Sequence, residues 1–161
     1  MNYLDVSYIL RLYVEDQGWE NVRALAAQAP VACGLHGHAE VVAALHRKLR
    51  EGAFTLTGFR QVLDQFELDC DNDAYRWLPL SPAVISRVRE AYRILPHSVF
   101  VRAGDALHLA CASENQLHEI YSNDQHLLNA AEHFALKGIN ILPAPVPAPG
   151  SPIRKRPKTD R

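Results

Sequence analysis

Near its start the chain reads Asn2-Tyr3-Leu4-Asp5-Val6-Ser7-Tyr8-Ile9-Leu10-Arg11-Leu12-Tyr13, and this stretch decides the fold. Residues 2–6 are expected to form a first strand, with Tyr3, Leu4 and Val6 as its apolar residues. Ser7 is a suitable N-cap for a helix, and the apolar residues that follow it repeat at a helical spacing. A strand that passes directly into an amphipathic helix predicts the first half of a β-α-β unit, in which helices join parallel strands.

The same alternation of short apolar runs and helical patterns continues to residue 142. It predicts further strands at residues 31–33, 76–80, 119–122 and 139–142. It predicts further helices at residues 19–29 and 38–50, from a cap at Thr57 through Phe66, from Ser81-Pro82 onward, and at 102–113 and 123–134. Strands separated by helices favour an α/β fold with a mostly parallel central sheet and helices on both of its faces. In such a sheet, ligands bind outside the carboxyl ends of the strands.

Length and composition limit the class of protein. The chain has 161 residues, of which 48% are hydrophobic and 22% charged, which is typical of one globular domain and excludes wholesale disorder. The apolar runs are too short to span a membrane, and an N-terminus that carries Asp5 does not resemble a signal peptide. Three widely spaced cysteines (Cys33, Cys70 and Cys111) form no CxxC pair and are expected to be reduced. We therefore expect a cytoplasmic protein.

The last 19 residues differ from the rest of the chain. Residues 143–161 hold six of the ten prolines and five of the 17 basic residues. We expect residues 1–142 to form one domain and residues 143–161 to form a Pro-rich, basic, disordered tail. The net charge of -1 divides accordingly into about -5 for the domain and +4 for the tail. Binding of a nucleic acid would therefore depend on local groups rather than on net charge.

Four acidic residues occupy unusual places in this pattern. Asp5 and Asp124 each fall where a predicted strand ends. Glu40 opens a helix beside its apolar face, and Asp105 lies in the first turn of a helix made almost entirely of Ala, Leu and Cys. Each acid alone has a structural explanation, as a helix cap or as a partner of the helix dipole. Together they predict an acidic pocket at the carboxyl edge of the sheet, where carboxylates need a cation.

The segments around these acids resemble the motifs of the PIN-domain nucleases, in particular the VapC-type toxins of toxin–antitoxin pairs. The four matching segments, in order, are residues 3–13, 39–45, 102–112 and 121–127. The resemblance covers about residues 1–142 and implies that Asp5, Glu40, Asp105 and Asp124 form the catalytic, metal-binding quartet. It also implies that two hydroxyl residues, Ser7 and Ser122, support the site.

The resemblance further implies an activity and partners. It implies hydrolysis of RNA phosphodiester bonds with Mg²⁺ or Mn²⁺, which prefer oxygen ligands, in a toxin that an antitoxin protein inhibits. It also implies a homodimer. Arg11 and Arg102 are the basic residues expected to contact RNA, because each lies near a motif acid in the sequence.

Two other functions remain open at this point. A phosphatase of the haloacid dehalogenase type also places Asp after its first strand, but it needs a second Asp at position 7, where this chain has Ser7. A catalytically silent module that binds RNA or protein is the other alternative. The pair His36 and His38 offers a weak transition-metal pattern, but no HExxH or CxxC motif supports a zinc site. A lone histidine on a helix is more often structural, and His108 is interpreted in that way.

Overall fold

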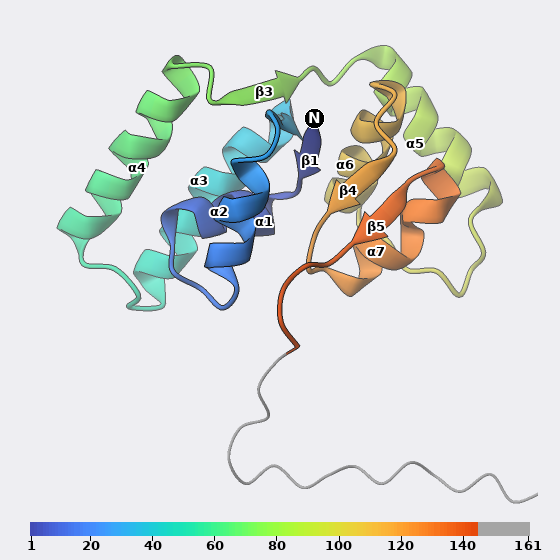
Figure 1. Cartoon of the computed structure of the whole chain (residues 1–161). Coiled ribbons are helices and arrows are strands. Elements are labelled where there is room, and N and C mark those ends of the chain that lie inside the picture. Colours follow the sequence, from blue (N-terminus) through green and yellow to red (C-terminus); the bar gives the residue numbers. More distant parts are fainter. Residues whose placement is uncertain (145–161) are drawn as a thin grey trace, which may run out of the picture.

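The structure is a computed structural model that describes residues 1–144. Its centre is a sheet of five strands in the order β3-β2-β1-β4-β5, and every neighbouring pair is parallel (Figure 1). The strands are β1 (Asn2–Leu4), β2 (Val31–Gly34), β3 (Tyr75–Leu78), β4 (Glu119–Tyr121) and β5 (Lys137–Ile139). The predicted α/β fold with a mostly parallel sheet is thus confirmed.

Helices join the strands and cover both faces of the sheet (Figure 1). The helices are α1 (Val6–Tyr13), α2 (Trp19–Ala26), α3 (Leu35–Arg50), α4 (Leu56–Asp71), α5 (Pro82–Ile94), α6 (Ala103–Glu114), α7 (Gln125–Ala130) and the 3-10 turn η1 (Ala131–Phe134). The first four helices pack in one core cluster, and α5, α6, α7 and η1 pack in the other. The change of face follows from right-handed crossovers, because the chain leaves β1 in one direction for β2 and β3 and in the other for β4 and β5.

Alternation of side chains along the strands separates the two cores. In β1, Tyr3 belongs to the core under α6, whereas the next residue, Leu4, belongs to the core under α1. In β4, Ile120 and Tyr121 divide in the same way. Successive strand residues point to opposite faces of a sheet, so a short strand covered on both sides consists of apolar residues throughout.

Several predicted boundaries are wrong. The N-cap of α1 is Asp5 rather than Ser7, because β1 ends at Leu4 and the Asp5 carboxylate accepts the Tyr8 N–H at 3.1 Å. Helix α4 is capped by Thr55, not Thr57, and continues to Asp71 because no Gly or Pro interrupts it after position 58. Smaller differences are the start of α3 at Leu35, the shift of β3 and β5 toward the N-terminus, and the 3-10 turn that ends the helix expected at 123–134.

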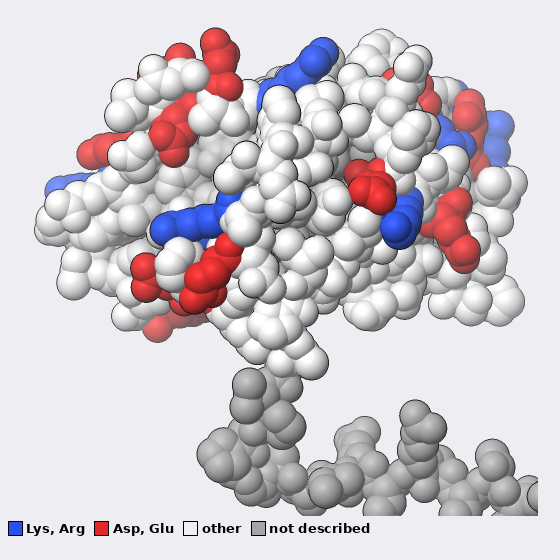
Figure 2. All heavy atoms as spheres, in the orientation of Figure 1, with Lys and Arg blue, Asp and Glu red and all other residues white. Residues whose placement is uncertain are grey.

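The surface carries no single-sign face on the side seen in Figure 2. Acidic side chains gather over the end of α4 that leads to β3, and α4 contains acids at positions 64, 67, 69 and 71. Lys and Arg side chains in this view lie apart from one another. Within residues 1–144, no helix combines the length and the apolar character needed to cross a membrane. Most of the predicted tail, residues 145–161, lies outside the described residues.

Candidate metal centre

The predicted acids lie at the carboxyl edge of the three central strands. Asp5 directly follows β1, Asp124 follows β4, and Glu40 lies in α3, which follows β2. Asp105 lies on α6, which packs under β2. Strands β2 and β3 lie on one side of β1, and β4 and β5 lie on the other. The strand order therefore has its topological switch point at β1, and open α/β sheets bind their ligands at the carboxyl end of such a point.

Asp5 is held by three donors in the interior of the protein. The side chain of this residue is 6% exposed. Its Oδ1 accepts the Ser7 hydroxyl at 2.6 Å and the Tyr8 N–H at 3.1 Å, and its Oδ2 accepts the Ser122 hydroxyl at 2.5 Å. Burial raises the pKa of Asp5, and the hydrogen bonds from the two serines oppose that rise. Both hydroxyls that the sequence singled out therefore contact the same carboxylate.

Asp124 and Asp105 are both contacted by Arg102. The Asp124 carboxylate caps α7 by accepting the His126 N–H at 2.8 Å, and it lies 3.6 Å from the Arg102 guanidinium. Asp105 Oδ2 accepts the backbone N–H of Arg102 at 3.4 Å. Burial raises the pKa of Asp105, and the neighbouring charge of Asp124 raises it further. Ser122 links this pair to Asp5, because its Oγ accepts the Asp124 N–H at 2.9 Å.

Glu40 has a different environment, in which His108 is its partner. The Glu40 carboxylate lies 2.9 Å from Nε2 of His108, and this contact lowers the pKa of Glu40. The other ring nitrogen of His108, Nδ1, lies 2.9 Å from the Tyr3 hydroxyl, which accepts the Gly34 N–H at 2.9 Å. These contacts form a continuous chain of hydrogen bonds when the Tyr3 hydroxyl donates to Nδ1 and His108 Nε2–H donates to Glu40.

The structure therefore brings the four acids to one edge but not into one ligand shell. Within residues 1–144, no three of these carboxylates have oxygen atoms within 4.8 Å of one another. Instead, each carboxylate contacts donors of the protein, and the mutual repulsion of the negative charges favours this separation. The donor set nevertheless fits a hard divalent cation, because it consists of carboxylate oxygens and its central member, Asp5, is buried with two serine hydroxyls and one backbone N–H as its donors.

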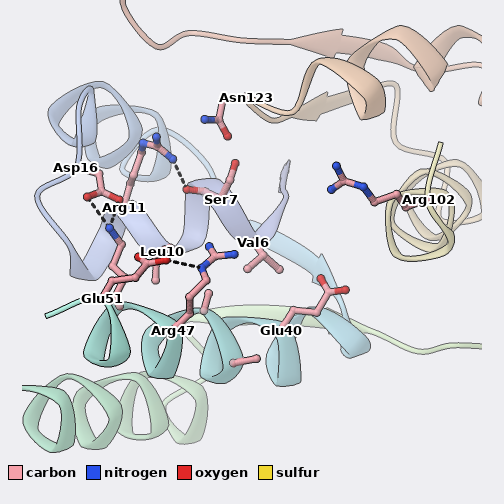
Figure 3. A pocket seen from close by; sticks show the side chains of 13 residues that line it. Val6, Ser7, Leu10, Arg11, Asp16, Glu40, Arg47, Glu51, Arg102 and Asn123 are labelled. Atoms are coloured by element: carbon pink, nitrogen blue, oxygen red, sulfur yellow. Dashed lines mark hydrogen bonds and ion pairs between the residues drawn. The ribbon is translucent and has the colours of Figure 1, made fainter. Parts of the chain in front are cut away.

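A cavity of about 740 Å³ opens beside these acids, between α1 and α3 (Figure 3). Glu40, Ser7, Asn123 and Arg102 line one part of it. Arg11, Arg47 and Lys48 line the part near Asp16 and Glu51. Arg11 donates to the Ser7 carbonyl at 2.6 Å, and Lys48 donates to Asp16 at 2.7 Å. The cavity thus has a lining of mixed charge, in which Lys48 pairs with Asp16 and Arg47 with Glu51, and the Glu40 carboxylate lies at one end.

Sequence reasoning missed the contacts that His108 makes with Glu40 and His36. The histidine pair predicted as a weak metal pattern is not brought together, because His38 packs against Phe66 and Trp77. His36 instead lies against His108, with ring centroids 4.1 Å apart. Burial and His108 lower the pKa of His36 to about 4. The signal was the spacing of four between His36 and Glu40, which places both on one face of α3.

Comparisons with known proteins agree with this geometry. Residues 3–133 match the PIN domain family, and a search of the curated proteins found no significant match. Solved structures that are similar include FitAcB from Neisseria gonorrhoeae, with a TM-score of 0.69 and 18% identity over 87% of this chain and 97% of that one. Another is VapBC2 from Rickettsia felis bound to a DNA fragment from their promoter, with a TM-score of 0.61 and 16% identity over 87% of this chain and 98% of that one. The family match spans most of the chain, so the chain belongs to the PIN domain family, as the four acidic motifs predicted.

Proposed function

We propose that this protein is a metal-dependent endoribonuclease that hydrolyses RNA phosphodiester bonds with Mg²⁺ or Mn²⁺. The observation that carries the proposal is the buried Asp5 carboxylate, which lies at the switch point of a PIN-domain sheet with Glu40, Asp105 and Asp124 at the same edge. Burial of a carboxylate is costly, and a divalent cation would compensate the charge of Asp5.

Asp5 and Asp105 are the primary ligands in this proposal, and Glu40 and Asp124 complete the set. A bound divalent cation supplies Lewis-acid polarisation of a phosphoryl oxygen and a water of lowered pKa. Ser7 and Ser122 orient the Asp5 carboxylate and favour its ionised form. Asp124 keeps its capping role on α7, so its contribution to the site is the weakest of the four.

Two arginines of the cavity, Arg11 and Arg102, are assigned to contacts with a phosphodiester backbone. Arg102 has a side chain that is 61% exposed, and Arg11 lies on the same cavity wall as Ser7. Both side chains are anchored, Arg102 on Asp124 and Arg11 on the Ser7 carbonyl. Arginines held in this way present donors to phosphate oxygens at a defined distance from the acids.

We also propose that the protein is the toxin of a toxin–antitoxin pair and that it forms a homodimer. The support for the toxin role is the likeness to FitAcB and VapBC2 at the level of the fold, whereas the homodimer rests on the resemblance of the sequence motifs. An antitoxin segment with a cationic side chain would fit the acidic end of the cavity near Glu40 and would compete with the metal there. Copurification of the toxin with its neighbouring gene product, and restored cleavage after their separation, would test this partnership.

The nuclease proposal is tested by cleavage of a structured RNA with Mg²⁺ or Mn²⁺. Asp5→Asn and Asp105→Asn should each reduce cleavage by 100-fold or more, because each removes a proposed metal ligand. Asp64→Asn on α4 changes an acid away from this edge and should leave cleavage unchanged. Cleavage that persists in both site variants contradicts the assignment of these ligands.

The same preparation distinguishes the alternatives. Hydrolysis of a small phosphate monoester without RNA cleavage would support a phosphatase, although Ser7 occupies the position where that family needs Asp. RNA binding that does not respond to metal, without any product, would support a silent binding module. Sequencing of RNA ends after controlled expression, beside Asp5→Asn, identifies the cleaved RNA.

A further inference from the structure

A second cluster of metal-ligating residues lies at the end of α3 nearest the sheet. Within residues 1–144, His36, Glu40 and His108 form the one group of three His, Cys, Asp or Glu residues whose ligand atoms all lie within 4.8 Å of one another. His36 and Glu40 share a face of α3, and His108 meets them from α6. Two imidazoles and one carboxylate are the ligand types of three-ligand zinc sites.

His36 is half-buried, and both nitrogens of its ring are inaccessible to solvent. Neither of its ring nitrogens makes a hydrogen bond in the described part of the chain, although both atoms are inaccessible. Buried polar atoms in folded proteins almost always have a partner, so each exception calls for an explanation. Coordination of a cation next to His108 would supply that partner to one of the two nitrogens.

Three glycines leave the space that the cluster occupies. A Cβ atom at Gly34 would lie 2.8 Å from Nδ1 of His36, and one at Gly104 would lie 3.0 Å from Oε1 of Glu40. A Cβ atom at Gly37 would lie 3.2 Å from Cε1 of His108. Any side chain at these positions would crowd one of the three ligands, so the backbone around the cluster is shaped to admit them.

Tyr3 supplies the outer support that ligating histidines need. Its hydroxyl lies 2.9 Å from Nδ1 of His108 and is itself anchored by the Gly34 N–H. A histidine ligand usually makes a hydrogen bond through its second nitrogen, which fixes the ring and the tautomer. Metal binding requires the other tautomer of His108 from the one that donates to Glu40: Nδ1 then carries the proton and donates to the Tyr3 hydroxyl, and Nε2 binds the metal beside Glu40.

We propose that His36, Glu40 and His108 bind a transition-metal cation of the zinc class, at a site distinct from the Asp5 and Asp105 carboxylates. Tetrahedral zinc with bonds of about 2.0–2.1 Å places its ligands about 3.3 Å apart, so no pair here has to close by more than about 1.5 Å. The fourth position is left to water. Because Glu40 also belongs to the proposed magnesium set, zinc at this site withdraws Glu40 and inhibits RNA cleavage. That consequence alone rests on the proposed nuclease function.

The test is zinc binding to the metal-stripped full chain, measured by competition with a chromophoric chelator and by the absorption spectrum of the Co²⁺ form. We expect one Zn²⁺ per chain and a loss of affinity of about 100-fold in His36→Ala. His38→Ala is the matched control, since it removes a histidine two positions away on the same helix that packs against Phe66 and Trp77. His38→Ala and Asp105→Asn should bind zinc as the wild type does.

Three outcomes overturn the site. They are unchanged zinc affinity in His36→Ala, equal loss in His36→Ala and His38→Ala, and loss in Asp105→Asn, which would place zinc at the other carboxylates. His108 is buried, so Glu40→Gln serves as the second ligand variant, with thermal melting to establish that each variant folds. Binding is measured without RNA, so a failure of the nuclease proposal leaves this result interpretable.

Discussion

Asp105 places a negative charge in the first turn of a helix that is otherwise apolar and largely buried. The N-terminal end of α6 favours that charge, but partial burial and the neighbouring Asp124 act against it and raise the pKa of Asp105. An acid whose pKa is higher in the folded than in the unfolded state lowers the free energy of unfolding when it ionises. This loss of stability grows as pH rises above the pKa of the unfolded state, near 3.8. The metal-free protein therefore carries a stability cost at neutral pH at the residue proposed to bind metal.

Asp105→Asn should therefore stabilise the protein in the absence of divalent metal. Near pH 7 we expect the melting temperature to rise by about 2–4 °C, and the difference from wild type should shrink as pH falls toward 4, where the carboxyl becomes protonated. Thermal melting in EDTA between pH 4 and pH 8 measures this difference. A difference that stays constant with pH would show that charge is not its cause.

Asp124 shows why single residues are hard to interpret from sequence. Taken alone, it is best explained as a helix cap, and the structure gives it that role on α7. The same carboxylate also lies 3.6 Å from Arg102 and influences the pKa of Asp105. One residue can therefore cap a helix and contribute to the charge of a site, and a local pattern reveals only the cap.

At the scale of elements, α3 carries the largest gap between sequence and structure at the site. The pattern predicted a helix over residues 38–50. The helix begins at Leu35, and this extra turn places His36 beside His108. Which face α6 turns toward α3 depends on tertiary packing, so the contact between residues 36 and 108 is not visible in either segment alone.

Gly37 tests the close packing of α3 on the sheet. An added Cβ would lie 2.6 Å from Sγ of the buried Cys33, so Gly37→Ala should destabilise the protein by about 1–3 kcal/mol although alanine is the better helix former. Cys33→Ala removes that sulfur, and the double variant should recover part of the loss. Denaturant unfolding of the two single variants and the double variant measures this coupling. Additive effects of the two substitutions would contradict a clash with Cys33.

At the scale of the whole molecule, the order of the strands explains how distant acids meet. The strand order and the right-handed crossovers place the ends of β2, β1 and β4 side by side, and Glu40, Asp5 and Asp124 follow these three ends. The sheet, its parallel strands and the shared edge were predictable from alternating segments. The hydrogen bonds that keep the carboxylates apart, and the pairing of Glu40 with His108, were not, because they depend on side-chain positions within about an ångström.

Charge is the other property of the whole chain that bears on RNA. The acidic domain opposes RNA binding, whereas residues 145–161 contribute five basic residues and one acid. Each phosphate contact made by a basic residue adds about 0.7 to the slope of log affinity against log salt for a single strand. Deleting residues 145–161 from the Asp5→Asn protein should therefore reduce that slope by as much as about 3.5, with weaker binding at low salt.

The matched control replaces the five basic residues of that segment with Gln and keeps its length, and it should reproduce the effect of the deletion because charge is the cause. RNA binding followed by fluorescence anisotropy between low and physiological salt measures the slope without interference from cleavage. An unchanged slope in both variants would assign RNA binding to the cavity between α1 and α3, whose basic residues include Arg11, Arg47 and Lys48. In that case Arg47→Gln, which changes a side chain that is 64% exposed, should lower the slope instead.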